Sequence, residues 1–377
     1  MPNYQARILT GWPSFFLDTM RILAALTVMY IHAHNMWFPA QTHDAAQPGE
    51  WSHASVIVFF VLSGYVIAHT TASNNRGGKQ YAVARLTRLC SIVIPALIIT
   101  AIIQYIVGNI NADMLSSYSR PHSGLRYVLC GMFLNNVWFF SMSPPINGAL
   151  WSLSFEFWYY AIFGLWLFRG KGWKSLVAPV LACLIAGPQI ITMMPIWLAG
   201  CLAYRLPRPV LKPAIAWVLV LACVFCGGQV VLTVPPLPYI IGTTHLLYAN
   251  QFITDWCTGF FFAMALWLVP QGVRASYQPA WVAWYRKLAD LTFPLYVLHY
   301  PMFILWGTWF GFKNTQFALA VCSVFVTALV LGHLFDKGRH TWQRFFNWLL
   351  SLGSLKYILN SRSLKARTSA STVFKKQ

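Results

Sequence analysis

The chain has 377 residues, of which 58% are hydrophobic and only 9% are charged, and its mean hydropathy is +0.55. This composition lies far outside the range of soluble globular domains and indicates a polytopic helical membrane protein. A net charge of +19 would elsewhere suggest a nucleic-acid partner, but here the cations follow a membrane topology and no nucleic-acid binding is expected.

Apolar segments that could each cross a membrane recur along the chain. They cover residues 14–36, 53–71, 89–108, 148–168, 173–187, 188–205, 210–233, 250–269, 289–310 and 315–336. If the N-terminus is cytoplasmic, nearly all of the 27 Lys and Arg residues fall on inside segments, as the positive-inside rule requires. The sequence therefore predicts an all-α polytopic bundle of about ten transmembrane helices with both termini in the cytoplasm.

Two stretches and the tail need a separate interpretation. Residues 173–205 contain prolines and have basic loops at both ends, so they must cross twice as short spans or dip in and return. Residues 125–140 would reverse the charge pattern if they crossed, which predicts an interfacial or re-entrant outer element. We expect one membrane domain, residues 1–337, and a basic cytoplasmic tail, residues 338–377, suited to anionic lipid.

The first apolar segment carries Arg21 and His32, which are eleven residues apart. At about 100° and 1.5 Å per residue, both side chains project from one helix face, about 16 Å apart. A charge at bilayer depth costs about 2.5 to 3.5 kcal/mol, so a span that carries Asp18, Arg21 and His32 is disfavoured unless this face lines a polar cavity. The alternative is an ion pair packed within the bundle.

His32 is the best candidate for a catalytic group, because an imidazole exchanges a proton near neutral pH. His34 follows two residues later, but that spacing turns the two rings about 200° apart on a helix. No metal site is predicted.

Arg85 and Arg88 lie at the cytoplasmic mouth of the third segment and are neighbours on a helix surface. Paired guanidinium groups suit phosphate recognition, although ordinary positive-inside anchoring is the alternative.

Glu156 lies in the middle of an apolar segment and needs a partner there. Arg21 and His32 are the expected partners, and structural pairing without catalysis is the rival interpretation. Ser63 and Gly64 form a small-residue surface that permits either close helix approach or access of a thin ligand arm.

Two more polar groups, Asp290 and His299, enter the ninth segment, where prolines can break the backbone hydrogen-bond ladder. Both could line the same cavity as the residues above, but the sequence does not place them there.

Five segments occur in the order seen in the acyltransferase-3 family of bacterial integral-membrane acyltransferases, which the chain resembles from about residue 14 to residue 336. They are LDTMRILAALTVMYIHAH, VIVFFVLSGYVI, ARLTRLCSIVIP, ALWSLSFEFWYY and LADLTFPLYVLHYP. The family's functional positions correspond here to Arg21 and His32, to the basic pair Arg85 and Arg88, and to Trp151, Ser152, Leu153 and Glu156.

The resemblance implies an enzyme of the bacterial inner membrane. It would transfer an acyl group, usually acetyl from cytoplasmic acetyl-CoA as co-substrate, to a hydroxyl of a cell-surface polysaccharide, lipopolysaccharide or related glycan, with no bound cofactor. We expect the CoA nucleotide at Arg85 and Arg88, with its pantetheine arm passing Ser63 and Gly64 towards His32.

In this mechanism His32 acts as general base while Arg21 stabilises the reacting thioester; a covalent acyl-histidine relay stays open. Glu156 would orient the base. Residues expected to line the cavity or to support these groups are Asp18, Trp151, Ser152 and His299.

The chain departs from the family pattern in two ways. Some members carry a C-terminal esterase-like domain, whereas this chain ends in a short basic tail, so a separate extracytoplasmic transfer protein could be needed. The family's closing Glu-x-Pro appears here as FDKGRH, and Asp336 receives no functional assignment.

Two functions of other classes compete with this reading. One is a multi-span transporter or flippase of a polysaccharide precursor, and the other is a noncatalytic scaffold for polysaccharide assembly.

Overall fold

The computed structural model describes residues 7–39, 50–73, 77–272 and 280–352, and every regular element in these ranges is a helix. Backbone groups inside a bilayer must be satisfied within their own segment, which is why long apolar segments form helices. Residues 353–377, most of the expected tail, lie outside the described ranges.

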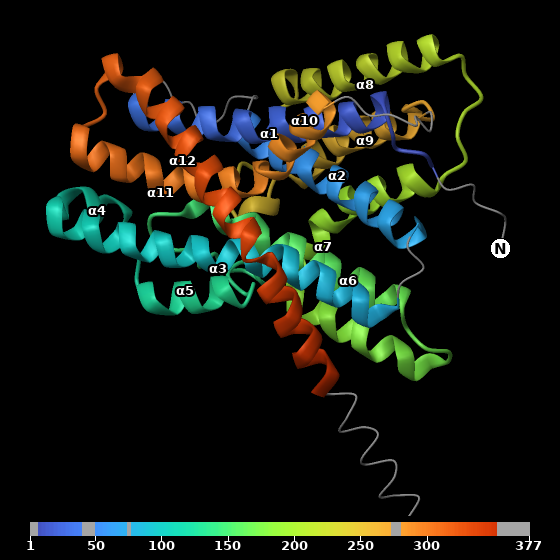
Figure 1. Cartoon of the computed structure of the whole chain (residues 1–377), viewed down its shortest axis with the longest axis horizontal. Helices are drawn as coiled ribbons and strands as arrows, with labels where there is room; N and C mark the ends of the chain where they lie inside the picture. Colours follow the sequence, from blue (N-terminus) through green and yellow to red (C-terminus); the bar gives the residue numbers. More distant parts are fainter. Residues whose placement is uncertain (1–6, 40–49, 74–76, 273–279, 353–377) are drawn as a thin grey trace, which may run out of the picture.

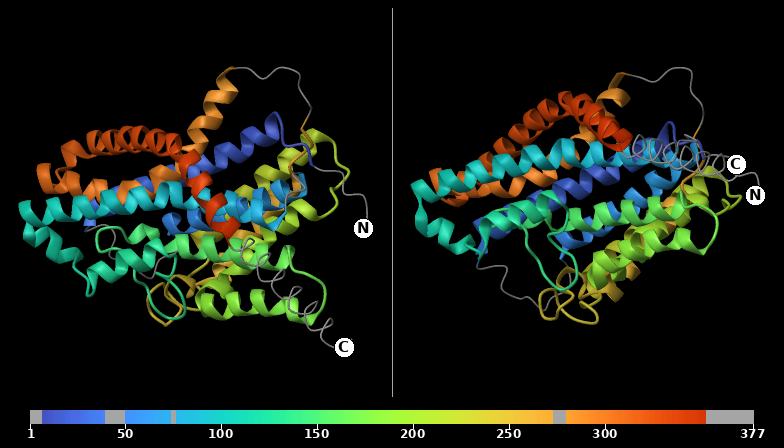
Figure 2. Two further views of the ribbon diagram at one scale, coloured as in Figure 1. Left: turned by 60° about the horizontal axis from the view of Figure 1, so that its bottom comes forward. Right: turned by 90° about the horizontal axis from the view of Figure 1, so that it is seen from below.

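The long helices are α1 (Trp12–Trp37), α2 (Trp51–Ser73), α3 (Gly78–Ile110), α7 (Val177–Arg205), α8 (Pro213–Thr233) and α12 (Phe317–Lys337). Most of them lie close to the expected segments, but α3 begins eleven residues before the expected segment 89–108, and α7 joins the two expected segments 173–187 and 188–205. Shorter helices complete the bundle: α4 (Ala112–Tyr118), α5 (Ser123–Gly131), α6 (Trp151–Leu167), α9 (Phe252–Leu268), α10 (Ala280–Asp290) and α11 (Thr292–Phe310). Helices α1, α3 and α11 run side by side along the length of the bundle (Figures 1 and 2).

Six helical segments of the described chain are long and apolar enough to cross a membrane, and a bent pair, α10 with α11, makes a possible seventh. The protein is therefore a multi-pass membrane protein. The other three expected crossings fall in α6 and α9, of 17 residues each, and in a second crossing within α7, which is counted once among the six. The count of ten stays a prediction.

The path of α7 is bent at Gly187, which has φ +77°. Ala178, near its start, lines a cavity with Gly78 at the start of α3. Tyr204, near its end, packs on His69 near the end of α2. Because α2 ends shortly before α3 begins, both ends of α7 lie at one end of the bundle (Figure 1).

The segment 125–140 contains no long helix. After α5 the chain enters the protein interior as irregular structure, where Asn135 and Asn136 are fully buried. Their side-chain amides donate to the carbonyl groups of Leu150 and Trp151 at the start of α6. These hydrogen bonds satisfy polar groups that lipid could not, which explains how non-helical backbone is tolerated there.

Helix α2 packs against α1, α7 and α9. Its crossing with α7 depends on two glycines, because a Cβ atom at Gly64 would clash with the carbonyl of Trp197 and one at Gly200 with that of Val61. Small residues that let helix backbones approach closely are typical of membrane helix interfaces.

At the C-terminal end of the described chain, a further helix covers residues 339–352 after α12. Helix α10 bends away from α11 by 47° and projects from the bundle (Figure 2).

Candidate active site

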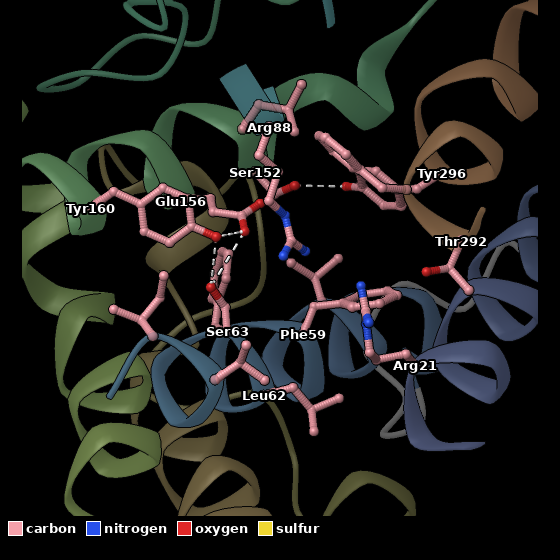
Figure 3. A pocket seen from close by; sticks show the side chains of 16 residues that line it. Arg21, Phe59, Leu62, Ser63, Arg88, Ser152, Glu156, Tyr160, Thr292 and Tyr296 are labelled. Atoms are coloured by element: carbon pink, nitrogen blue, oxygen red, sulfur yellow. Dashed lines mark hydrogen bonds between the residues drawn. The ribbon is translucent and has the colours of Figure 1, made fainter. Parts of the chain in front are cut away.

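A central cavity lies where α1, α2, α3, α6 and α11 meet (Figure 3). The guanidinium groups of Arg21, from α1, and Arg88, from α3, both reach into it. The polar residues of its lining are Arg21, Ser63, Arg88, Ser152, Glu156, Tyr160, Thr292 and Tyr296. Arg21 of α1 therefore faces a cavity whose wall contains charged and hydroxyl groups among its apolar side chains.

Glu156 has partners that the sequence did not suggest. Its carboxylate accepts hydrogen bonds from the hydroxyl groups of Tyr160, one helical turn later, and of Ser63 at 3.3 Å. The indole of Trp197 in turn donates to Ser63 at 3.2 Å. The expected direct pairing of Glu156 with Arg21 and His32 is therefore wrong, because Tyr160 and Ser63 hold the carboxylate instead.

Arg21 forms its ion pairs with two aspartates. Its nearest nitrogen lies 3.7 Å from Asp290 and 3.9 Å from Asp18, and Arg286 is 3.9 Å from the other oxygen of Asp18. Asp290 ends α10, so the bend before α11 brings this acid to α1. The negative charge of Asp18 therefore stabilises the positive charge of Arg21.

Arg85 and Arg88 face different cavities. Arg88 enters the central cavity, whereas Arg85 lines a mostly apolar cavity between α3, α6 and the first half of α7. The guanidinium of Arg85 lies 5.7 Å from the ring centre of Tyr81 and 5.9 Å from that of Tyr160, within the range of cation–π attraction. Tyr160 lines both cavities and separates the two arginines.

His32 lines a different cavity of about 480 Å³, which we call the outer cavity because the expected topology would place it towards the extracytoplasmic side. The other polar or aromatic residues of its lining are Asn35, Glu50, Ser52, His53, Tyr118, Trp151, Tyr248, Tyr296 and Tyr300. Val56 and Tyr296 line both this cavity and the central one, so the two cavities adjoin.

A second histidine fixes the tautomer of His32. Nδ1 of His32 lies 2.8 Å from Nε2 of His299, and Nδ1 of His299 lies 3.1 Å from the carbonyl oxygen of Leu295. A carbonyl only accepts, so His299 carries its hydrogen on Nδ1 and accepts through Nε2. His32 then donates from Nδ1, which leaves the lone pair of its Nε2 free for chemistry.

The outer cavity also contains His53, which sequence reasoning did not select. Its Nε2 lies 3.0 Å from Oδ2 of Asp255, and Gln251 donates to the other carboxylate oxygen at 3.1 Å. A signal was present, because Asp255 is the single acid in the apolar segment 250–269. The argument that selected Glu156 applies to Asp255 equally well.

The remaining expected residues have clear positions. Ser152 lines the central cavity, and Trp151 lines the outer one. Gly64, expected at the donor site, faces the backbone of α7 rather than a cavity. The expectation that Gly64 contributes to the donor site is therefore wrong. Because Gly64 has no side chain, α2 can pack closely on α7. Only its neighbour Ser63 faces the central cavity.

Within the described ranges, no three His, Cys, Asp or Glu side chains are grouped so that they could hold a metal ion. The ionisable groups available for chemistry are two imidazoles and the carboxylate of Glu50 in the outer cavity, and two guanidiniums with the carboxylate of Glu156 in the central cavity.

Comparison with known proteins agrees with this architecture. Residues 14–335 match the family model described as an acyltransferase domain, Acyl_transf_3. A relative named O-acetyl transferase, from Shigella phage Sf6, is 25% identical over 176 residues, 44% of this chain and 49% of that protein. The chain thus matches about half of the length of this relative, and no solved structure matches it. Since the family match covers most of the chain, the protein belongs to the acyltransferase 3 family.

Proposed function

We propose that the protein is an O-acyltransferase of the bacterial inner membrane that moves an acyl group, most simply acetyl, from cytoplasmic acyl-CoA to a hydroxyl of a cell-surface glycan. The observation that carries this proposal is that α1 presents Arg21 to one cavity and His32 to an adjoining one. The arginines of the first cavity suit the negative charge that develops on a reacting thioester. The imidazole in the adjoining cavity suits proton transfer from an acceptor on the other side of the membrane.

The donor would enter from the cytoplasm, in a topology of about ten crossings with both termini inside. The phosphates of CoA would meet Arg85, and the pantetheine arm would pass Tyr160 and Ser63 into the central cavity. Arg88 and Arg21 would stabilise the charge that develops on the thioester oxygen and on the leaving thiolate.

The acceptor would occupy the outer cavity, where His32 presents its free Nε2. An imidazole there can act as general base or can carry the acyl group itself. Membrane lipid surrounds the bundle, and a separate extracytoplasmic protein would be needed only for an acceptor that cannot reach this cavity.

The test uses purified protein in liposomes with labelled acetyl-CoA and candidate glycans. Wild type should release CoA and label the glycan, and folded, inserted His32→Ala and Arg21→Ala variants should not. Full acyl transfer by both variants would contradict the proposal.

The same assay distinguishes acyl transfer from the two competing functions. A flippase would move the glycan across the membrane without consuming acetyl-CoA, and a scaffold would do neither. Arg85→Gln and Arg88→Gln should impair use of the donor more than binding of the acceptor, because both residues are assigned to the CoA side.

A further inference from the structure

The outer cavity contains a second imidazole that is held as a proton acceptor. His53, from α2, and Asp255, from α9, are 4% and 2% exposed and are hydrogen-bonded at 3.0 Å. A carboxylate accepts through its oxygens, so the Nε2 of His53 carries the hydrogen and its Nδ1 is left with a lone pair. His53 lines the same cavity as His32.

The ring of His53 is also fixed in orientation. It stacks on Trp151, with ring centres 5.5 Å apart and planes 9° from parallel, and Trp151 stacks on Tyr248 at 4.2 Å. Gln251 holds the second oxygen of Asp255. With both the ring plane and the carboxylate held, the imidazole needs no rearrangement before it takes a proton.

The two imidazoles of this cavity differ in what supports them. His53 has a carboxylate partner, the arrangement that stabilises an imidazolium formed when the ring removes a proton from a hydroxyl. His32 has a second imidazole, His299, which fixes its tautomer but contributes no negative charge. His32 therefore suits a nucleophile with a free Nε2, and His53 suits a base.

We propose that His53, oriented by Asp255, removes the proton from the acceptor hydroxyl, while His32 carries the acyl group between donor and acceptor. This inference rests on the proposed acyltransferase function and assigns the chemistry of its outer cavity. It replaces a single imidazole acting as base with two imidazoles that divide the reaction.

Acyl transfer takes place in two chemical steps. Nε2 of His32 forms a bond to the thioester carbon, the carbon–sulfur bond breaks, and CoA leaves as its thiolate. The acceptor hydroxyl then gives its proton to Nδ1 of His53 while its oxygen bonds to the acyl carbon. The bond from that carbon to His32 breaks, His32 becomes neutral again, and His53 releases its proton to water.

The experiment separates the two steps by single-turnover kinetics with labelled acetyl-CoA. Without acceptor, His53→Gln should release CoA and label the protein as wild type does. With acceptor, transfer to the glycan should fall by about 10²- to 10⁴-fold. Asp255→Asn, which keeps the size of the side chain, should lower kcat for transfer and leave kcat/KM for the donor unchanged, because only the second step is slowed. His32→Ala should lose both steps.

Controls distinguish catalysis from a structural role. His34→Gln and Asp113→Asn change the same residue types outside the cavity linings and should behave as wild type. Added imidazole should partly restore transfer by His53→Ala, since a small base can enter the space of the lost ring. A structural role would not give this rescue.

Four results would each overturn a different part of the proposal. Transfer at the wild-type rate by folded His53→Gln would overturn the assignment of His53. Wild-type protein that transfers acetyl without ever becoming labelled would overturn the role of His32 as carrier. If His53→Gln does not fold, Asp255→Asn at the wild-type rate would overturn the dyad. Wild-type protein with no acetyl transfer would remove the proposed function itself.

Discussion

Ser152 and Tyr296 join their hydroxyl groups in a hydrogen bond of 2.8 Å where the central and outer cavities adjoin. The Tyr296 hydroxyl donates to the carbonyl of Ala149 at 2.6 Å, so Ser152 must be the donor to Tyr296. These hydrogen bonds hold the Tyr296 ring at the boundary between the two cavities, where the side chain of Val56 also lies. In the proposed route, the thioester end of acyl-CoA has to pass this pair on its way from the central cavity to His32.

The space at this boundary should therefore limit the size of the acyl group that can be transferred. In Val56→Phe the larger side chain should slow transfer, and it should slow butyryl transfer more than acetyl transfer. Val56→Ala should keep or widen the range of donors. Initial rates with acetyl-, propionyl- and butyryl-CoA measure this selectivity.

Val66 provides the matched control, since it lines the central cavity but is not among the residues of the outer one. Val66→Phe should leave the ratio of butyryl to acetyl rates closer to that of wild type. Equal ratios in Val56→Phe and wild type would show that the acyl group takes another route.

His299 should act as a positioning residue for His32. In His299→Ala the Nδ1 hydrogen of His32 loses its acceptor, so the ring can adopt the tautomer that blocks Nε2. We expect kcat to fall by about 10²-fold while the donor KM changes little. The split between kcat and KM checks this expectation.

His299→Gln should recover part of the lost rate, because its amide oxygen can accept from His32. Equal activity of the Ala and Gln variants would argue against a role in fixing the tautomer. His34→Ala, a histidine of α1 that packs on Tyr30 and Phe38, serves as the control.

The two arginines of α3 should have separable effects. Arg88 reaches into the central cavity, so Arg88→Gln should lower kcat for acyl transfer. Arg85 faces the cavity beyond Tyr160, so Arg85→Gln should chiefly raise the KM for acyl-CoA. Steady-state kinetics with varied acyl-CoA measure both, and an unchanged donor KM in Arg85→Gln would remove the docking assignment.

The crossing of α2 and α7 should be sensitive to a single methyl group. Gly64→Ala and Gly200→Ala each place a Cβ atom against a carbonyl group of the opposite helix, which forces the helices apart. Overpacking of this kind costs about 1–3 kcal/mol, so the Tm of the detergent-solubilised protein should fall. Gly124→Ala, whose added Cβ meets nothing within 4 Å, is the control and should unfold as wild type does.

Much of the fold followed from local properties of the chain. The expected segments 14–36, 53–71 and 315–336 lie within two residues of α1, α2 and α12 at each end. Hydropathy and helical periodicity act over a few turns, so they can be evaluated without knowing any neighbour. The position of Arg21 and His32 on one face of α1 could be predicted for the same reason, because it depends only on their spacing along the helix.

The sequence by itself determined the membrane class, the long helices and the polar face of α1. Only the tertiary structure decided which groups meet: Glu156 with Tyr160 and Ser63, Gly64 with α7, and His53 with Asp255, 202 positions away. The physical reason is that a buried polar group must find a partner, but its identity depends on how helices distant in sequence pack.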